Sequence, residues 1–164
     1  MELKKTFDFR RLFAILYALF FASYLAIGLQ PMAEASNYEI SDSIEIPSIH
    51  LYSEVTTLKL VDRKLNTPDD IVGSFSQNKN KTLLIGHVST VFERLNDVLV
   101  GDSIIYNSTT YTVTDTITLP KTNIKMNELL ASSEKPTIVI MTCAGDFISQ
   151  YDTTHRLIVT AQAE

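Results

Sequence analysis

The chain has 164 residues, of which 14 are Lys or Arg and 19 are Asp or Glu, so its formal net charge at neutral pH is −5. Beyond residue 30 the balance is more acidic, with 10 Lys and Arg against 17 Asp and Glu. This argues against a nucleic-acid partner, because binding to phosphates needs a positive face. The length allows one domain with a short appendage.

The amino-terminal part has the features of a membrane anchor. Residues 12–29 are 18 residues without a charge, which at about 1.5 Å per residue nearly cross a bilayer core of about 30 Å. Four basic residues precede this stretch and none follows until Lys59, a bias that places the amino terminus in the cytoplasm. We expect a cytoplasmic tail at 1–11, a single-pass transmembrane signal-anchor at 12–29, a stalk at 30–42 and an extracellular domain at 43–164.

Cleavage of this segment is the alternative. Ala33-Glu34-Ala35 resembles a signal-peptidase site. The uninterrupted apolar run, however, is longer than the roughly 7–15 residues of a cleaved signal, which favours a retained anchor. Either way the domain is exported.

From Ile44 onward, short apolar stretches separated by turn residues predict a mainly β domain. The clearest hairpin joins 103–106 to 111–119, with Tyr111, Val113, Asp115, Ile117 and Leu119 expected on one side of the second strand. Helical spacing indicates a helix over 92–100, ended by Gly101, and one or two turns over 125–133. Seven or eight short strands with little helix are typical of a barrel or sandwich, and few charged edge residues favour closure.

The only cysteine of the sequence, Cys143, follows an apolar strand that begins after Pro136. We expect this strand to end at Cys143, a loop to occupy 144–154 and the last strand to cover 155–161. A thiol at the end of a strand, beside a flexible Ala-Gly pair, can face a groove, although a lone cysteine can also be a small buried hydrophobe. One cysteine excludes an internal disulfide framework.

Two further residues lie at predicted strand ends. His87 ends the apolar strand 82–85, and Arg156 begins the last strand. Strand ends from distant parts of a chain can meet at one rim of a barrel, where a nearby cation or base activates a thiol. The imidazole can then return a proton to a leaving amine, and the guanidinium can donate hydrogen bonds to an oxyanion. Thr142 is a candidate for substrate contact, with strand packing as the alternative.

The other two histidines are assigned no catalytic role. His50 falls in a predicted early strand without a cationic or nucleophilic neighbour, so we interpret it as structural. His155 adjoins Arg156, and strand alternation predicts that it faces away from the thiol. The acidic residues are scattered without calcium-loop spacing, and no metal or cofactor is predicted.

These residues lie in motifs that resemble those of the sortases, cysteine transpeptidases of the Gram-positive cell envelope. The resemblance covers roughly 44–161. It comprises Ile44-Glu45-Ile46-Pro47, Gly86-His87, Phe92-Glu-Arg-Leu95, Gly101-Asp102, Val139-Ile140-Met141-Thr142-Cys143 and Arg156-Leu-Ile-Val159. Val139 and Ile140 stand where the family pattern has Thr and Leu, and both suit a strand.

The resemblance implies a closed barrel of about eight strands with short helices and a catalytic set of His87, Cys143 and Arg156. Cys143 would form a thioester with the Thr of a Leu-Pro-x-Thr-Gly-like sorting signal of a surface protein. The acceptor would be an amine of a cell-wall precursor or a pilin lysine, or water in a peptidase reaction. About 16 residues between Leu119 and Pro136 argue against class B, and the absence of a second apolar span after residue 161 argues against class C. Classes A, D and F stay open.

Two other functions fit part of the sequence. An L,D-transpeptidase is also a cysteine acyl-transfer enzyme, but its family carries His-Gly-Cys close together, whereas Met141-Thr142 precede Cys143 here. A membrane-tethered β-barrel binding module with an inert cysteine is the non-enzymatic alternative.

Overall fold

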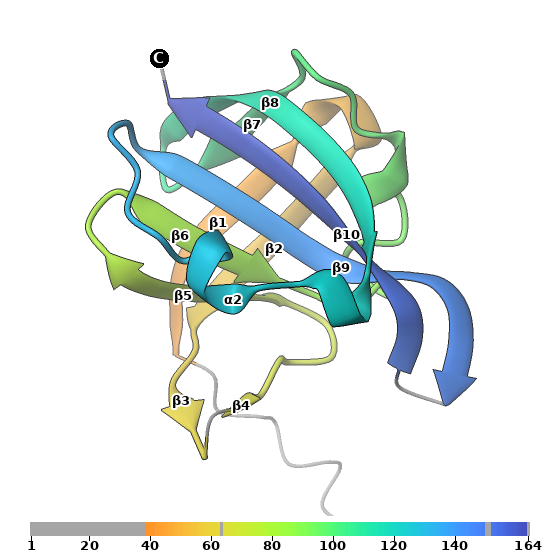
Figure 1. The fold of residues 1–164 in the computed structure, drawn as a ribbon. Coiled ribbons are helices and arrows are strands. Elements are labelled where there is room, and N and C mark those ends of the chain that lie inside the picture. Colours follow the sequence, from red (N-terminus) through yellow and green to blue (C-terminus); the bar gives the residue numbers. More distant parts are fainter. Residues whose placement is uncertain (1–38, 63, 150–151, 164) are drawn as a thin grey trace, which may run out of the picture. The chain divides into compact units, whose positions relative to one another are not determined.

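The computed structural model describes residues 39–62, 64–149 and 152–163. Eight strands close into a barrel in the order β1-β2-β5-β6-β9-β10-β8-β7 (Figure 1), which confirms the predicted mainly β, closed architecture. These strands are β1 (Ile40–Ile46), β2 (Leu51–Thr57), β5 (Val72–Asn78), β6 (Lys81–Ile85), β7 (Ser103–Tyr106), β8 (Thr109–Pro120), β9 (Thr137–Ser149) and β10 (Asp152–Ala163). A separate pair consists of β3 (Leu60–Val61) and β4 (Lys64–Leu65).

The predicted membrane anchor at 12–29 lies outside the described residues. Within the ranges that are described, no helix is both long enough and apolar enough to cross a membrane. Strand β1 begins at Ile40, so the predicted domain start at residue 43 falls inside this strand.

Two parallel pairings set the geometry of the domain. β2 runs parallel to β5, and β6 runs parallel to β9, while the other barrel neighbours are antiparallel. A parallel pair needs a long connection, and the one between β6 and β9 contains β7 and β8. The register pairs Ile85, the last residue of β6, with Met141, so the carboxyl end of β6 lies beside the middle of the much longer β9.

Apolar side chains cover both faces of the sheet around β6, β9 and β10. Ile138 and Ile140 belong to the large core cluster, whereas Val139 between them belongs to a second cluster with Leu83 and Ile158. Since successive side chains of a strand point to opposite faces, the first cluster fills the barrel and the second lies on its outer face. The connection between β8 and β9 packs against the outer cluster through Ile124, Leu129 and Leu130.

The predicted hairpin is confirmed as β7 and β8, joined at Asn107 and Ser108. Both turn residues have positive φ, 47° and 60°, which matches the twist of a two-residue hairpin loop. The expectation that one face of β8 holds every second residue from Tyr111 to Leu119 is wrong. The register against β10 shifts at Thr114, an extra residue whose Oγ1 donates to Thr160 O across 3.2 Å, and a bulge of this kind moves later side chains to the other face.

The helix predicted over 92–100 is also wrong. Turns occupy 88–94 and a 3-10 helix, η2, covers Leu95–Asp97. Phe92, Leu95 and Val98 are buried as their spacing suggested, but Leu99 is exposed. The helical turn expected within 125–133 is confirmed as α2 (Met126–Leu129), which follows the 3-10 helix η3 (Lys121–Asn123).

Candidate active site

The outer face of the β6, β9 and β10 sheet continues from the apolar cluster into a polar pocket. Met141 and Ile85 are partly buried and pack against the outer cluster, and they are directly paired across the parallel β6–β9 ladder. Two residues beyond each of them come Cys143 and His87. Since two residues complete one strand period, Cys143 lies on the outer face like Met141. His87 lies beyond the end of β6 and lines the same pocket as Cys143.

Arg156 is the direct cross-strand partner of Cys143 in the antiparallel β9–β10 ladder, and Ile158 likewise pairs with Met141. Opposed residues in such a ladder have Cβ atoms about 4.5–5.5 Å apart on the same face of the sheet. The guanidinium and the thiol therefore share a face because of register alone.

The strand ends predicted here are wrong. β9 continues past Cys143 to Ser149, and β10 begins at Asp152 rather than at 155. Thr153 and Thr154 supply the reason, because their hydroxyls accept hydrogen bonds from the backbone N–H groups of Ala144 and Asp146 where the register shifts. Cys143 and Arg156 consequently lie within a long hairpin, on the outer face of the barrel, and not at a rim formed by strand ends.

His87 does follow the end of its strand, as predicted. Its carbonyl accepts the N–H of Phe92 across 3.0 Å, which starts the turns after β6. About a third of the side chain is exposed, and Nε2 lies 3.8 Å from Asp69 Oδ1. The bend that carries Asp69 is held in place by Thr90, whose Oγ1 donates to Asp69 O across 2.6 Å.

One pocket of about 160 Å³ brings the three predicted catalytic residues together. His87, Cys143 and Arg156 all line it, with Ile85 and Met141 supplying its apolar part, and the remaining lining residues are Thr67, Gly86 and Thr142. Cys143 is a free thiol and is partly exposed, so it is not a packed core residue.

Thr142 lies on the other face of β9 from Cys143. Its side chain is buried, and Oγ1 donates to Gly86 O across 2.8 Å. The hydroxyl hydrogen is therefore engaged by the protein, which favours strand packing, the alternative raised for this residue. Its role in substrate contact stays a prediction.

The Arg156 guanidinium is held by the β9–β10 hairpin. Nη1 donates to His155 O across 2.8 Å, and to the carbonyl and hydroxyl oxygens of Thr153 across 3.2 and 3.1 Å. Nη2 donates to Asp152 Oδ1 across 2.8 Å. Only 16 % of the arginine side chain is exposed, so these bonds fix a largely enclosed cation.

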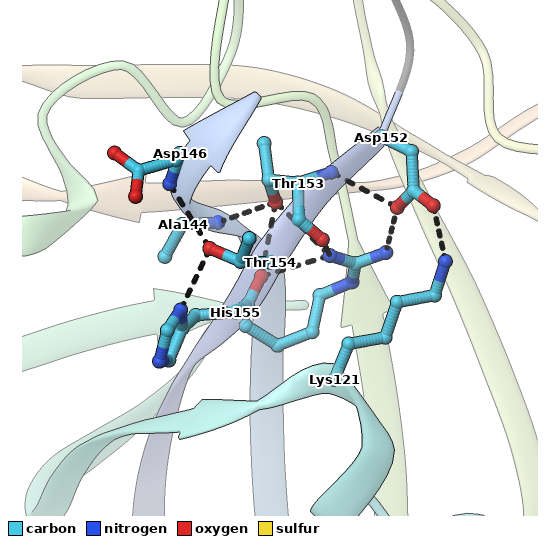
Figure 2. Close-up of polar contacts among 8 residues, drawn as sticks. Lys121, Ala144, Asp146, Asp152, Thr153, Thr154 and His155 are labelled. Carbon is cyan, nitrogen blue, oxygen red and sulfur yellow. Dashed lines mark hydrogen bonds and ion pairs between the residues drawn. The ribbon is translucent and has the colours of Figure 1, made fainter. Parts of the chain in front are cut away.

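Asp152 also accepts a hydrogen bond from Lys121 Nζ on its second carboxylate oxygen, as Figure 2 shows. The hydrogen bonds from Lys121 and Arg156 lower the pKa of Asp152 to about 2, because they favour the charged form. Asp152 is thus an anion throughout the neutral range. Sequence reasoning missed both partners, since 144–154 was assigned to a loop and Lys121 lies 31 residues from Asp152.

The other histidines stand apart from this pocket. His155 is not among its lining residues, and its Nδ1 lies 2.8 Å from Thr154 Oγ1, in agreement with the prediction that His155 faces away from the thiol. The prediction that His50 lies in a strand is wrong. It lies in the turn between the 3-10 helix η1 (Pro47–Ile49) and β2, where it is exposed and has a φ of 54°. It lines a different, larger cavity of about 560 Å³. Within 39–62, 64–149 and 152–163, no three His, Cys, Asp or Glu residues are grouped to hold a metal ion.

Residues 44–164 match the family model described as the sortase domain. The chain belongs to the sortase family. This match supports the general function of a sortase transpeptidase. Members of this family use a cysteine. No curated protein sequence matches the chain significantly.

Solved sortase structures share the fold. A lid mutant of sortase A from Corynebacterium diphtheriae aligns with a TM-score of 0.62 and 22 % identity, over 86 % of this chain and 78 % of that chain. Sortase A from Listeria monocytogenes gives 0.59 and 22 %, over 76 % and 87 %. A sortase D5 transpeptidase from Clostridium perfringens gives 0.59 and 17 %, over 77 % and 79 %. Because solved structures named as sortase C also match, the subclass stays a prediction.

Proposed function

We propose that this sortase cleaves a Leu-Pro-x-Thr-Gly-like sorting signal through a thioester on Cys143 and transfers the acyl product to an amine. The observation that carries the proposal is the common pocket of Cys143, Arg156 and His87. It holds a nucleophile, a permanent cation and a proton carrier in one place, which is what acyl transfer requires.

The first half-reaction forms the acyl-enzyme. The Cys143 sulfur, as thiolate, attacks the carbonyl carbon of the signal's Thr, and Arg156 donates hydrogen bonds to the oxygen that becomes negative. His87 gives a proton to the nitrogen of the departing Gly, so the C–N bond breaks and an amine leaves. The product is a thioester between Cys143 and the shortened surface protein.

The second half-reaction restores the thiol. A primary amine attacks the thioester carbonyl, the C–S bond breaks, and His87 accepts the proton that the amine gives up. An acceptor amine from a cell-wall precursor or a pilin lysine yields an amide, whereas water yields a carboxylate and makes the reaction a hydrolysis. Ile85 and Met141 offer an apolar surface beside the thiol, suited to the apolar residues of the signal.

The transfer reaction is tested with the full-length chain, a panel of Leu-Pro-x-Thr-Gly-like peptides and a primary amine, with products identified by mass spectrometry. We expect one peptide at least to give the amide, and Cys143→Ala to give none. His87→Gln should also lose turnover. His155→Gln is its matched control and should retain turnover, because His155 lies outside the pocket. Equal turnover by the parent and the Cys143→Ala protein contradicts the proposal.

We further propose that residues 12–29 anchor the enzyme in the cell membrane with residues 43–164 outside. The uncharged stretch and the preceding basic residues support this. Protease added to intact cells or protoplasts should degrade the catalytic domain while a short cytoplasmic fragment survives. Recovery of the whole chain in the cytosolic fraction contradicts it.

A further inference from the structure

Arg156 does not reach the pocket as a free side chain. Four acceptor atoms of the β9–β10 hairpin surround its two terminal nitrogens, and the only charged one among those recorded belongs to Asp152. No acceptor is recorded for Arg156 Nε among the residues that the structure describes. Nη2 carries two N–H groups, and among the described residues only its bond to Asp152 is recorded, so the Nε–H and one Nη2–H are the guanidinium donors available to a ligand in the pocket.

Asp152 is itself held from both sides. Arg156 binds one carboxylate oxygen and Lys121 the other, while the Thr153 N–H donates to Asp152 Oδ1 across 2.9 Å. Lys121 does not belong to the hairpin. It begins η3, in the connection between β8 and β9, and β8 ends beside β10 where Pro120 pairs with His155. The lysine therefore ties the carboxylate to a second element.

We propose that Asp152, held by Lys121, is a positioning residue that fixes the guanidinium of Arg156 so that its remaining N–H donors, on Nε and Nη2, serve a ligand in the Cys143 pocket. The proposal rests on the proposed acyl transfer, in which Arg156 contacts the substrate. Neither Asp152 nor Lys121 lines the pocket, so both act through the arginine.

The effect is expected on turnover rather than on stability. Ion pairs that are partly open to solvent contribute little to folding, and both Asp152 and Lys121 are partly exposed. Turnover depends more strongly on the orientation of Arg156, since a displacement of about 1 Å in a catalytic group can reduce a rate about 100-fold. The three groups form one linked chain, so the effects of Lys121 and Asp152 should not be additive.

The first experiment compares Asp152→Asn with Asp146→Asn in the full-length chain. Both remove one carboxylate from the same hairpin, but no side-chain contact of Asp146 with Arg156 is recorded in the described part of the chain. We expect Asp152→Asn to lower kcat at least about tenfold with KM nearly unchanged, and Asp146→Asn to retain parent kinetics. Equal kcat for the two variants overturns the proposal.

The second experiment changes Lys121. Lys121→Met should lower kcat by a smaller factor in the parent and have no further effect in the Asp152→Asn background, whereas Lys121→Arg should restore parent turnover. Lys125→Met is the matched control, because Lys125 lies in the same connection and pairs with Glu128. Additive losses from Lys121→Met and Asp152→Asn contradict the linked chain.

A third readout needs no substrate. In nitrogen-15 spectra, a fixed Arg156 should give an Nε–H signal resolved from those of the other arginines, of which the chain has five in all, assigned by its loss in Arg156→Lys. Asp152→Asn should weaken or shift it, and Asp146→Asn should not. An unchanged signal overturns the proposal even if no peptide is turned over, whereas a shifted signal with an inactive parent enzyme counts against the proposed acyl transfer alone.

Discussion

One buried hydroxyl joins the two segments that carry the proposed base and nucleophile. Thr142 Oγ1 donates to Gly86 O, and each of these residues directly precedes one of the pair Cys143 and His87. The hydrogen bond therefore continues the β6–β9 connection one step beyond the last ladder pair, Ile85 with Met141. We therefore expect it to fix how the chain leaves β6 relative to β9, and with it the separation of imidazole and thiol.

Thr142→Val should therefore lower both stability and turnover. Losing the donor leaves the buried Gly86 carbonyl without its partner, at a cost of about 1–3 kcal/mol in the free energy of unfolding. It also frees the His87 backbone, so kcat should fall more than the stability loss explains. Urea denaturation and steady-state kinetics measure the two effects.

Thr137→Val is the matched control for this prediction. Thr137 is buried at the other end of the apolar part of β9, where its hydroxyl donates to Lys135 O. It should cost similar stability without changing kcat. If the two variants change kcat equally, the bond at Thr142 has no special part in placing His87.

The identities of the pocket residues could be predicted from the sequence, but their supports could not. Cys143, His87 and Arg156 stand out because each adjoins an apolar strand and carries a group suited to acyl transfer. Asp152 and Lys121 give no such signal. Their contact depends on the register of β10 between β8 and β9, and that register includes shifts that no local pattern reveals.

At the scale of elements, the turn after β6 is set by close packing against Gly86. A Cβ atom added there would lie 2.5 Å from Val91 Cγ1 and 2.7 Å from the Phe92 ring. Phe92 is fully buried, so it has no space to move into. The absence of a side chain at Gly86 is what lets this turn fold back onto the barrel immediately after His87.

Gly86→Ala should destabilise the protein by about 1–3 kcal/mol through this overlap and reduce kcat by displacing His87. Gly101→Ala is the informative comparison. Gly101 has φ of 95° but no neighbour within 4 Å of an added Cβ. Backbone strain alone should therefore destabilise the Gly101→Ala protein. Thermal unfolding and steady-state kinetics distinguish the two variants. A parent-like kcat in Gly86→Ala contradicts the expected displacement of His87.

Two local conformations were predicted poorly from sequence patterns, and both failures have the same physical cause. The apolar spacing from Phe92 to Val98 correctly indicated buried side chains, but packing against the barrel holds them in turns and a 3-10 helix. Gly145 suggested the end of a strand. In the structure it has φ of 76° and packs closely against Thr154 and His155, so the glycine permits a local irregularity within the β9–β10 hairpin. In both cases tertiary contacts decide the local conformation.

For the molecule as a whole, anchored carboxylates predict a loss of stability in acid. Asp102 accepts hydrogen bonds from Leu99 N across 3.0 Å and from Ser48 Oγ across 2.8 Å, and these lower its pKa. The pKa of Asp152 is also lowered. A carboxyl group whose pKa is lower in the folded state stabilises fully above its unfolded value and loses that contribution as the pH falls through its folded value.

The free energy of unfolding should therefore decline as the pH falls from about 4 towards about 2. Asp102→Asn should lower stability at pH 7, by about 1 kcal/mol for the weakened hydrogen bonds, and should show a shallower decline in acid. Urea midpoints across this range measure the effect. An identical acid slope in parent and variant contradicts the assignment to Asp102.

The account as a whole depends on sulfur being the attacking atom in a pocket formed by distant parts of the chain. The most direct measurement is the intact mass of the full-length enzyme, acid-quenched during turnover of a cleaved peptide, followed by mapping of the modified residue. We predict an added acyl fragment on Cys143 that hydroxylamine releases and that increases when the acceptor amine is withheld. Turnover without any adduct on Cys143, or with the adduct on another residue, would contradict the account.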